Sequence, residues 1–496
     1  MCFVHLFSSY TADNANNVLP TFVVLPSRVG KPRFSSLLKS NIIIFRGLYL
    51  ALRRCSSVQN KNRLKMNYNN SKLGDELHLL CDRLFPINRS LTGKGVRKTL
   101  SILKEYLPEM VVCEVPSGTK CFDWTIPDEW NINSAYIISP EGEKIVDFQS
   151  NNLHVVGYSN PVDLKLSLKE LEPHLHSLKG LPNAIPYVTS YYSEYWGFCM
   201  TDTQRGELTD GTYHAVIDSE KTKGSMTYGE LIVKGKTDKE VLLSTYICHP
   251  SMANNELSGP VVTTYIAKFI KSIDNYYTYR ILFIPETIGS IYYISTHLNQ
   301  LKENVVAGYV LTCIGDDKSY SFLPSRAGDT LSDIAAIHAL KHTCSNFISY
   351  SYLDRGSDER QYCSPGVDLP IASIMRSKYH EYPEYHTSMD NLEFVTPSGL
   401  FGGFMATKRA IESIENNIVY KVTQLCEPQL GKRGLYPNLG GVDTYKKVQN
   451  RMNLLAYADG ETDLLSIANK LNIPIWDLRI EAELLREAGL LECVGR

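Results

Sequence analysis

Polar residues that could do chemistry stand directly after four apolar stretches in the second half of the chain. His249 follows LLSTYIC, Glu286 follows ILFIP, Gly315-Asp316-Asp317 follow VLTCI, and Arg376 follows IASIM. Each has an ordinary structural explanation on its own; Glu286, for example, could cap a following helix. Ligands of open α/β sheets bind beyond the carboxyl ends of the strands, so this repeated placement predicts one shared site.

The residue types in these segments fit a catalytic zinc site. Zinc accepts imidazole nitrogen and carboxylate oxygen, and a catalytic zinc keeps one position for water. A carboxylate beside that water can take its proton and pass it to the leaving group. His249 and His386 could supply the nitrogens, and Asn255 or Glu256 the oxygen ligand. Glu286 would then be the free carboxylate.

The elements that must position these residues alternate from about residue 241 onward. The segments VLLSTYIC, YRILFIP, VVAGYVLTCI and LPIASIM are typical of buried strands. Between and after them, the segments GPVVTTYIAKFIKSI, SIYYISTHLNQL, GDTLSDIAAIHALKHT and PSGLFGGFMATKRAIESI are typical of helices. Apolar strands interleaved with helices predict an α/β fold, with a mostly parallel sheet covered by helices on both faces.

The region before this alternation has two parts. Residues 66–110 show apolar residues at helical spacing, whereas 111–235 consist of short alternating segments that favour β structure. The aromatic stretch IPYVTSYYSEYWGFC, residues 185–199, has two interpretations. Such clusters are usually packed cores or interfaces. The alternative is a wall of the substrate pocket.

The C-terminal segment, 421–496, has the pattern of a small helix-turn-helix or winged-helix unit. Its second helix, expected between Trp476 and Ala488, carries four acids against two arginines. A helix that reads a DNA groove needs the opposite balance. We therefore predict a packing or homo-oligomer contact and no nucleic-acid partner.

Composition narrows the class of protein further. A chain of 496 residues with 43% hydrophobic and 21% charged residues is expected to fold into two or three globular domains. The formal net charge of −2 gives no electrostatic basis for binding nucleic acid or anionic membranes. Twelve scattered cysteines without a CxxC pair indicate reduced thiols, and the apolar runs are too short for a membrane span. These features predict a cytoplasmic protein.

The first 65 residues differ from the rest, with one acid, Asp13, against ten lysines and arginines. An organelle transit peptide has this character. Translated upstream sequence before Met66 is the other explanation, and the one we favour. In either case we exclude 1–65 from the fold and expect this extension to be poorly ordered.

Several motifs, in order along the chain, resemble a known family. CHPSMANNELSGP, PETIGS and YHTSMDN are similar to motifs of the zinc aminopeptidase and glutaminyl cyclase superfamily. With WTIPDEW, YYSEYWGFC, LTCIGDD and RGSDERQYCSPGVDLP, they more closely resemble aminopeptidase-like proteins associated with bacterial polysaccharide biosynthesis. The resemblance implies an aminopeptidase-like α/β domain (66–110 and 236–420), an inserted β-rich domain (111–235) and a C-terminal winged helix.

The resemblance also implies roles for single residues. His249 and His386 match the histidine ligands, and Glu286 matches the general base. Three other positions depart from the dizinc pattern: Asn255 replaces a metal-bridging Asp, Thr287 a ligand Glu, and Cys313 a further ligand Asp. One zinc ion is therefore expected rather than two, with Glu256 or Asp358 as possible substitute ligands.

The expected function is that of a zinc-dependent, aminopeptidase-like hydrolase. It would cleave a peptide or amide bond near a free amine in a small substrate, using metal-activated water and Glu286. Tyr385 or Arg376 would stabilise the oxyanion or a substrate carboxylate, and the amine would be bound by Glu381, Glu384 or Asp358. Two alternatives are a single-zinc acyl transferase or deacylase acting on a small molecule or sugar, and a degenerate binding or scaffold protein.

Overall fold

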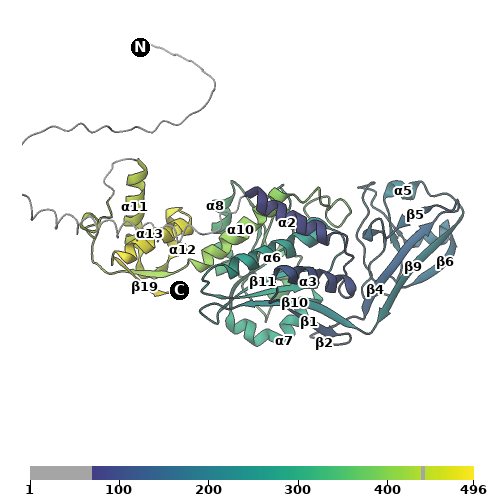
Figure 1. Cartoon of the computed structure of the whole chain (residues 1–496), viewed down its shortest axis with the longest axis horizontal. Helices are drawn as coiled ribbons and strands as arrows, with labels where there is room; N and C mark the ends of the chain where they lie inside the picture. Colours follow the sequence, from purple (N-terminus) through teal and green to yellow (C-terminus); the bar gives the residue numbers. More distant parts are fainter. Residues whose placement is uncertain (1–69, 437–441) are drawn as a thin grey trace, which may run out of the picture. The chain divides into compact units, whose positions relative to one another are not determined.

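The computed structural model describes residues 70–436 and 442–496, and its largest element is an eight-stranded sheet (Figure 1). Its strand order is β1-β10-β12-β11-β13-β16-β14-β15. The strands span Val111–Pro116 (β1), Ser225–Val233 (β10), Thr278–Ile284 (β12), Glu240–Tyr246 (β11), Val305–Val310 (β13), Ile371–Met375 (β16), Ser321–Leu323 (β14) and Ile348–Ser349 (β15). This sheet and its helices confirm the α/β class. The expected extension, 1–65, lies outside the described residues.

The centre of the sheet is parallel and buried on both faces. Strands β12, β11, β13 and β16 run parallel, and every residue of β11 and β12 is buried. Neighbouring residues of β11 enter different cores, since Leu243 packs in one hydrophobic cluster and Leu242 in the other. Because both faces of these strands are covered, their sequences are mostly hydrophobic rather than alternating.

Two groups of helices cover the sheet. Five helices within residues 70–415 contribute to the Leu243 core, and helices of the C-terminal segment extend it. The five are α2 (Asn70–Leu84), α3 (Lys94–Tyr106), α6 (Ser258–Lys271), α8 (Leu331–Thr343) and α10 (Pro397–Glu415). Helix α7 (Ile288–Asn304) contributes to the Leu242 core, together with the short helices α9 (Glu359–Tyr362) and α4 (Leu168–Leu171). The parallel strands therefore deliver their carboxyl ends to one edge of a sheet enclosed on both sides.

A second sheet accounts for most of the β-rich region. Its order is β5-β4-β9-β6, with bounds Lys144–Asp147 (β5), Glu129–Ile138 (β4), Thr212–Thr222 (β9) and Val162–Ser167 (β6). The β-rich region also contains two small strand pairs and two short helices. The pairs are β2 (Lys120–Cys121) with β3 (Trp124–Thr125) and β7 (Leu175–His176) with β8 (Phe198–Cys199), and the helices are α4 (Leu168–Leu171) and α5 (Asp202–Gly206).

The ends of the expected insertion, 111–235, belong to the large sheet. Strand β1 pairs antiparallel with β10, and β10 pairs antiparallel with β12. The separate four-stranded sheet thus lies within 129–222. Alternating apolar residues are compatible with an antiparallel strand in either sheet. The sequence pattern therefore could not show where the large sheet ends and the four-stranded sheet begins.

The C-terminal unit has the elements of a winged helix. They are β17 (Val419–Val422), α11 (Val442–Tyr457), β18 (Asp459–Asp463), α12 (Leu464–Leu471), α13 (Ile475–Glu487) and β19 (Leu491–Gly495), with sheet order β18-β17-β19. On α13, Arg479 and Arg486 both form ion pairs with Glu483. The absence of a nucleic-acid partner stays a prediction.

A buried histidine joins this unit to α8. His338 Nδ1 lies 2.7 Å from Asn469 Oδ1 on α12, and His338 Nε2 accepts the N–H of Ile475 at 2.9 Å. An Nε2 that accepts a backbone N–H must be unprotonated, so the contact requires the neutral Nδ1–H tautomer. Burial accordingly lowers the pKa of His338 from 6.5 to about 4.

Acid should therefore weaken this junction. The contribution of His338 to folding is complete above pH 6.5 and is lost as the pH falls toward 4, because the unfolded chain binds the proton more readily. Between pH 7.5 and 4.5, the free energy of urea unfolding should fall by about 2 to 3 kcal/mol more in the wild type than in His338→Gln. Equal dependence in His338→Gln and the wild type would contradict the assignment.

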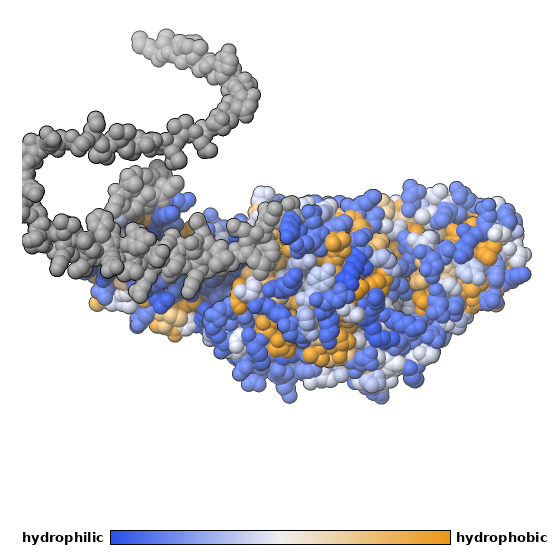
Figure 2. All heavy atoms as spheres, viewed as in Figure 1, coloured by the Kyte–Doolittle hydropathy of each residue, from blue (hydrophilic) through white to orange (hydrophobic). Residues whose placement is uncertain are grey.

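The visible face of the molecule mixes hydrophilic and hydrophobic residues in small patches (Figure 2). Scattered exposed apolar side chains are normal for a folded protein and need no special explanation. Among the helices in 70–436 and 442–496, none has the length and apolar character needed to cross a membrane.

Candidate metal and catalytic site

A strained turn after β12 orients Glu286. Thr287 has φ 65° and ψ −74°, and the N–H of Ile288 donates to the carbonyl of Glu286 at 2.8 Å, which defines a γ-turn of the rare positive-φ type. A β-branched residue in this conformation costs about 1–3 kcal/mol. Asp358 Oδ1 stabilises the turn by accepting the Thr287 N–H at 2.7 Å and the Ser290 hydroxyl at 2.8 Å.

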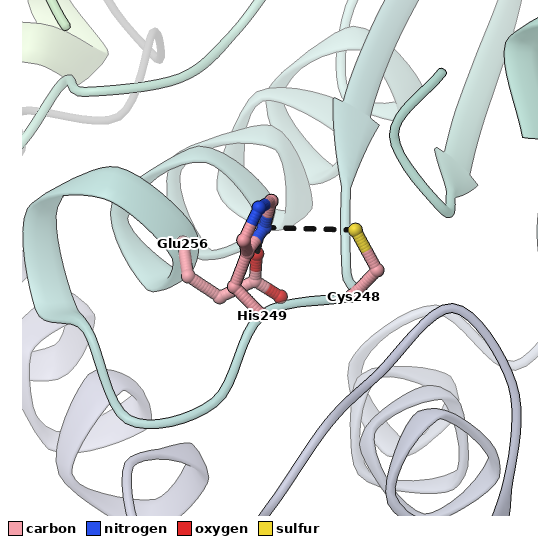
Figure 3. A group of neighbouring side chains, drawn as sticks. All are labelled: Cys248, His249 and Glu256. Atoms are coloured by element: carbon pink, nitrogen blue, oxygen red, sulfur yellow. Dashed lines mark hydrogen bonds and ion pairs between the residues drawn. The ribbon is translucent and has the colours of Figure 1, made fainter. Parts of the chain in front are cut away.

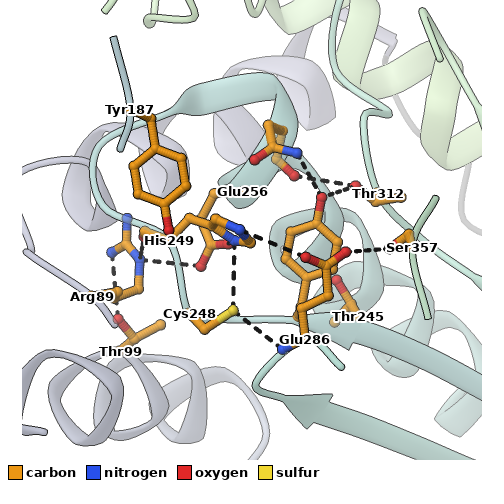
Figure 4. Close-up of polar contacts among 12 residues, drawn as sticks. Arg89, Thr99, Tyr187, Thr245, Cys248, His249, Glu256, Glu286, Thr312 and Ser357 are labelled. Atoms are coloured by element: carbon orange, nitrogen blue, oxygen red, sulfur yellow. Dashed lines mark hydrogen bonds and ion pairs between the residues drawn. The ribbon is translucent and has the colours of Figure 1, made fainter. Parts of the chain in front are cut away.

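His249 lies between two carboxylates just beyond the end of β11 (Figure 4). Its Nδ1 is 3.0 Å from Glu256 Oε2, and its Nε2 is 3.6 Å from Glu286 Oε2. Glu256 belongs to η3, a π-helical turn at Ala253–Leu257 that leads into α6. Such turns are frequent at functional sites. The two ring nitrogens thus face different surroundings, and Nε2 is the one directed toward Glu286.

Cys248, His249 and Glu256 form a group whose ligand atoms lie within 4.8 Å of one another (Figure 3). These three could hold a metal by distance alone. However, the guanidinium of Arg89 lies 3.3 Å from Glu256 Oε1, and both side chains are completely buried. The arginine already neutralises Glu256 and would repel a cation there. Glu256 instead has the geometry of a carboxylate that orients a metal-binding histidine through its other nitrogen.

His386 brings a second imidazole close to His249. Its ring stacks on Tyr385 with centroids 3.9 Å apart, and its carbonyl accepts the N–H of Tyr187 at 2.8 Å. The ring centroids of His249 and His386 are 5.8 Å apart. Two imidazoles on one tetrahedral zinc have centroids roughly 5 Å apart. The buried Nε2 of His386 has no hydrogen-bond partner among the described residues, so this pair fits a metal ion.

Asn255 adds an oxygen atom without a partner. Its Nδ2 donates to the Tyr246 hydroxyl at 2.7 Å, whereas its buried Oδ1 accepts no hydrogen bond from any residue that the structure describes. Asp390 stabilises this segment by accepting the backbone N–H groups of Asn254 at 2.5 Å and Asn255 at 2.9 Å. Sequence reasoning missed Asp390, although it stands in the motif YHTSMDN.

Burial dominates the electrostatics of the site. It raises the pKa of Glu286, and it raises those of Asp358 and Asp390 to about 7. Burial also lowers the pKa of His386 to about 3, and the charge of His249 adds to this effect. For His249 itself, burial opposes protonation, but contacts with Cys248 and Glu256 raise the pKa well above 6.5.

A cavity of about 360 Å³ is lined by three of the residues singled out in the sequence, His249, Glu286 and His386. The other lining residues are Leu91, Trp124, Tyr187, Thr189, Tyr191, Tyr192, Thr287, Ile288 and Arg360. Three tyrosines thus come from the aromatic stretch 185–199. Arg360 and the hydroxyl of Ser357, which donates to Glu286 Oε1 at 2.7 Å, were not anticipated. Both stand in the RGSDERQY motif, and that motif was the available signal.

Other predicted residues lie elsewhere. Arg376 donates to the carbonyl of Ser319 at 2.7 Å and stacks over Tyr320, because β16 is flanked there by β14. Asp316 and Asp317 also have structural partners: the former accepts from Ser377 at 2.8 Å, the latter from Ser398 at 2.8 Å.

The acids expected to bind an amine also lie outside the cavity. Glu384 forms an ion pair with Lys318 at 2.8 Å, and Glu381 lies 3.9 Å from Lys378. Asp358 lies behind the Thr287 turn. None of these three acids is among the described residues that line the cavity, and neither is Arg376. Tyr385, which stacks on His386, is not among them either.

The chain is similar to known proteins over most of its length. Residues 78–417 match the family described as a domain of unknown function (DUF4910), and residues 418–493 match a winged helix-turn-helix family. A Clostridium acetobutylicum protein named "Putative polysaccharide biosynthesis protein with aminopeptidase-like domain" is 44% identical over 428 residues, covering 86% of this chain and 98% of the relative.

Two solved structures have folds similar to that of this chain. A crystal structure titled as that of a "putative peptidase" from C. acetobutylicum has 43% identity and a TM-score of 0.81, covering 86% of this chain and 98% of that one. The zinc aminopeptidase BSAP from Bacillus subtilis has the same fold at 12% identity and a TM-score of 0.52, covering 69% and 95%. Fold and site together define an aminopeptidase-like α/β protein with a C-terminal winged helix. The chain belongs to the DUF4910 family.

Proposed function

We propose that this protein is a zinc-dependent hydrolase that cleaves an amide or peptide bond in the cavity beside Glu286. The observation that carries the proposal is the pair of imidazoles, His249 and His386, at one cavity with a carboxylate whose pKa is raised by burial. The name of the C. acetobutylicum relative and the fold of the B. subtilis zinc aminopeptidase support it.

The residues present fit one metal ion. His249 and His386 would hold it through their Nε2 atoms, and Asn255 Oδ1 would be an uncharged third ligand. Bound zinc would polarise a substrate carbonyl and lower the pKa of a water molecule. A second ion lacks ligands: Thr287 Oγ1 accepts a hydrogen bond from Arg360, and Cys313 is a buried thiol 3.8 Å from the Tyr382 hydroxyl.

Glu286 is suited to move a proton. Ser357 fixes Oε1 through a hydrogen bond of 2.7 Å, which leaves Oε2 facing His249 and the cavity. Burial raises the pKa of the carboxyl, so the protonated form is more accessible than for an exposed glutamate. A base that is easily protonated can return the proton to the leaving amine in the next step.

Asn255→Asp should tighten zinc binding by roughly tenfold or more. A unit charge 4 Å from a cation contributes about 4 kcal/mol at intermediate dielectric, and 1.4 kcal/mol corresponds to a factor of ten. The measurement is zinc stoichiometry and affinity by chelator competition. Unchanged affinity would show that Asn255 does not face the metal, and two tightly bound ions in the wild type would defeat the single-zinc proposal.

Two further variants separate the possible metal positions. If the ion is bound at the Nε2 atoms, Cys248→Ser should retain it, and Glu256→Gln should weaken binding by about 10- to 100-fold through loss of the hydrogen bond to Nδ1. If the ion were held by Cys248, His249 and Glu256 instead, Cys248→Ser would release it.

A further inference from the structure

The cavity has an unusual balance of charge for an enzyme that acts beside a free amine. Glu286 is the one carboxylate, and Arg360 the one permanently charged cation, among the described residues that line it. Arg360 donates from Nη2 to Thr287 Oγ1 at 2.7 Å. No carboxylate in the described part of the chain lies within ion-pair distance, 4.0 Å, of this guanidinium. Its other N–H groups therefore remain available to a ligand.

A protonated amine would find no counter-charge in this cavity besides Glu286, which the proposed reaction needs. The remaining candidates, Asp358, Glu381 and Glu384, are engaged by the Thr287 turn, Lys378 and Lys318. An ammonium group in the same space as Arg360 would also be repelled. The electrostatics thus favour a substrate with a negative charge.

We infer that the substrate carries a carboxylate, which Arg360 binds while the scissile amide lies toward His249 and Glu286; this inference rests on the hydrolase function proposed above. A guanidinium matches a carboxylate through two parallel hydrogen bonds. The structure thereby assigns Arg360 as the residue that determines specificity. The preferred substrates are N-acyl amino acids and similar N-acylated acids, not unmodified N-termini.

The aromatic side chains that line the cavity determine which substrate group fits beside the carboxylate. Trp124 on β3 and Tyr192 meet edge to face with ring centroids 6.1 Å apart, and the hydroxyls of Tyr187 and Tyr191 are 2.9 Å apart. These rings offer a largely apolar, aromatic surface. A cavity of about 360 Å³ is at the small end of the range for ligand sites, which suits one amino-acid or sugar unit better than a long peptide.

Equilibrium binding of three matched probes tests the inference without turnover. The probes are N-acetyl-L-phenylalanine, its neutral C-terminal amide, and L-phenylalaninamide with a free amine. Calorimetry with the full chain kept metal-free by a chelator, so that no probe is hydrolysed, should show the carboxylate probe binding roughly tenfold or more tightly than either amide, as expected for a charge-assisted hydrogen bond.

The matched variants are Arg360→Gln and Arg355→Gln. Arg355 is an exposed arginine on the same segment that stacks over Tyr352, so its removal changes the net charge equally. Arg360→Gln should abolish the preference and Arg355→Gln should keep it. A preference that survives Arg360→Gln, equal affinities, or no measurable carboxylate binding would overturn the inference.

The same experiment distinguishes this inference from the proposed function. If the carboxylate preference depends on Arg360 but the protein neither binds zinc nor hydrolyses amides, only the hydrolase proposal fails. If zinc binding and Glu286-dependent hydrolysis are found without the preference, only the assignment of Arg360 fails.

Discussion

Replacing Glu286 with glutamine is expected to lower the turnover of an amide substrate by roughly a hundredfold or more, the usual range for loss of a positioned proton-transfer group. Glutamine keeps the size of the side chain and can still accept the hydrogen bond that Ser357 donates at 2.7 Å. It cannot take up a proton at neutral pH. The zinc content should remain nearly unchanged, because the proposed ligands are the two histidines and Asn255.

The measurement pairs steady-state rates on N-acyl amino acids and on peptides with zinc analysis of the same samples. Glu384→Gln is the matched control, since it neutralises a carboxylate that pairs with Lys318 outside the cavity, and it should retain wild-type turnover. His386→Gln should instead lose both metal and activity. Wild-type turnover in Glu286→Gln would place the base on another residue.

The large sheet and the placement of two site residues could be predicted because burial leaves a clear signal in the sequence. Strands β11 and β12 are buried throughout, so their mostly apolar sequences identified them, and the first polar residues after them are His249 and Glu286. Strand ends of a parallel sheet meet at one edge, which explains why these two converge. The same rule did not extend to Arg376, which follows β16. Strand β14 pairs antiparallel with β16, and the carbonyl of Ser319, just before β14, accepts a hydrogen bond from the Arg376 side chain.

The contacts that tune the site could not be predicted, because they depend on backbone geometry or on pairing between distant segments. The positive φ of Thr287 turns its side chain toward Arg360, 73 residues away, and nothing in the letters PETIGS indicates a γ-turn. Arg89 lies in a segment, NRSLTGKG, that had no assigned role, yet its Nε donates to the carbonyl of His249, 160 residues later. Such pairs follow from packing and not from local periodicity.

The second large effect is on stability, and it concerns Arg89. Arg89→Met is expected to lower the free energy of unfolding by about 3–5 kcal/mol, because it leaves the charge of Glu256 buried without its partner. Both side chains are wholly buried, and Arg89 also donates to the carbonyls of His249 and Leu84 at 2.9 Å and 2.8 Å. Methionine fills a similar length without offering a donor, so the loss is electrostatic more than steric. Urea unfolding at neutral pH measures it.

The double variant Arg89→Met/Glu256→Gln should recover part of this loss, because a neutral amide is less costly to bury than an unpaired carboxylate. Arg83→Met is the matched control. It breaks an ion pair of 2.7 Å with Glu105 at the surface, where solvent screens the charges, and should leave the unfolding midpoint nearly unchanged. If Arg89→Met resembled Arg83→Met and the double variant gave no recovery, Glu256 would have to be uncharged in the fold. Its hydrogen bond to Nδ1 could then no longer be the charged contact that orients His249 toward the cavity.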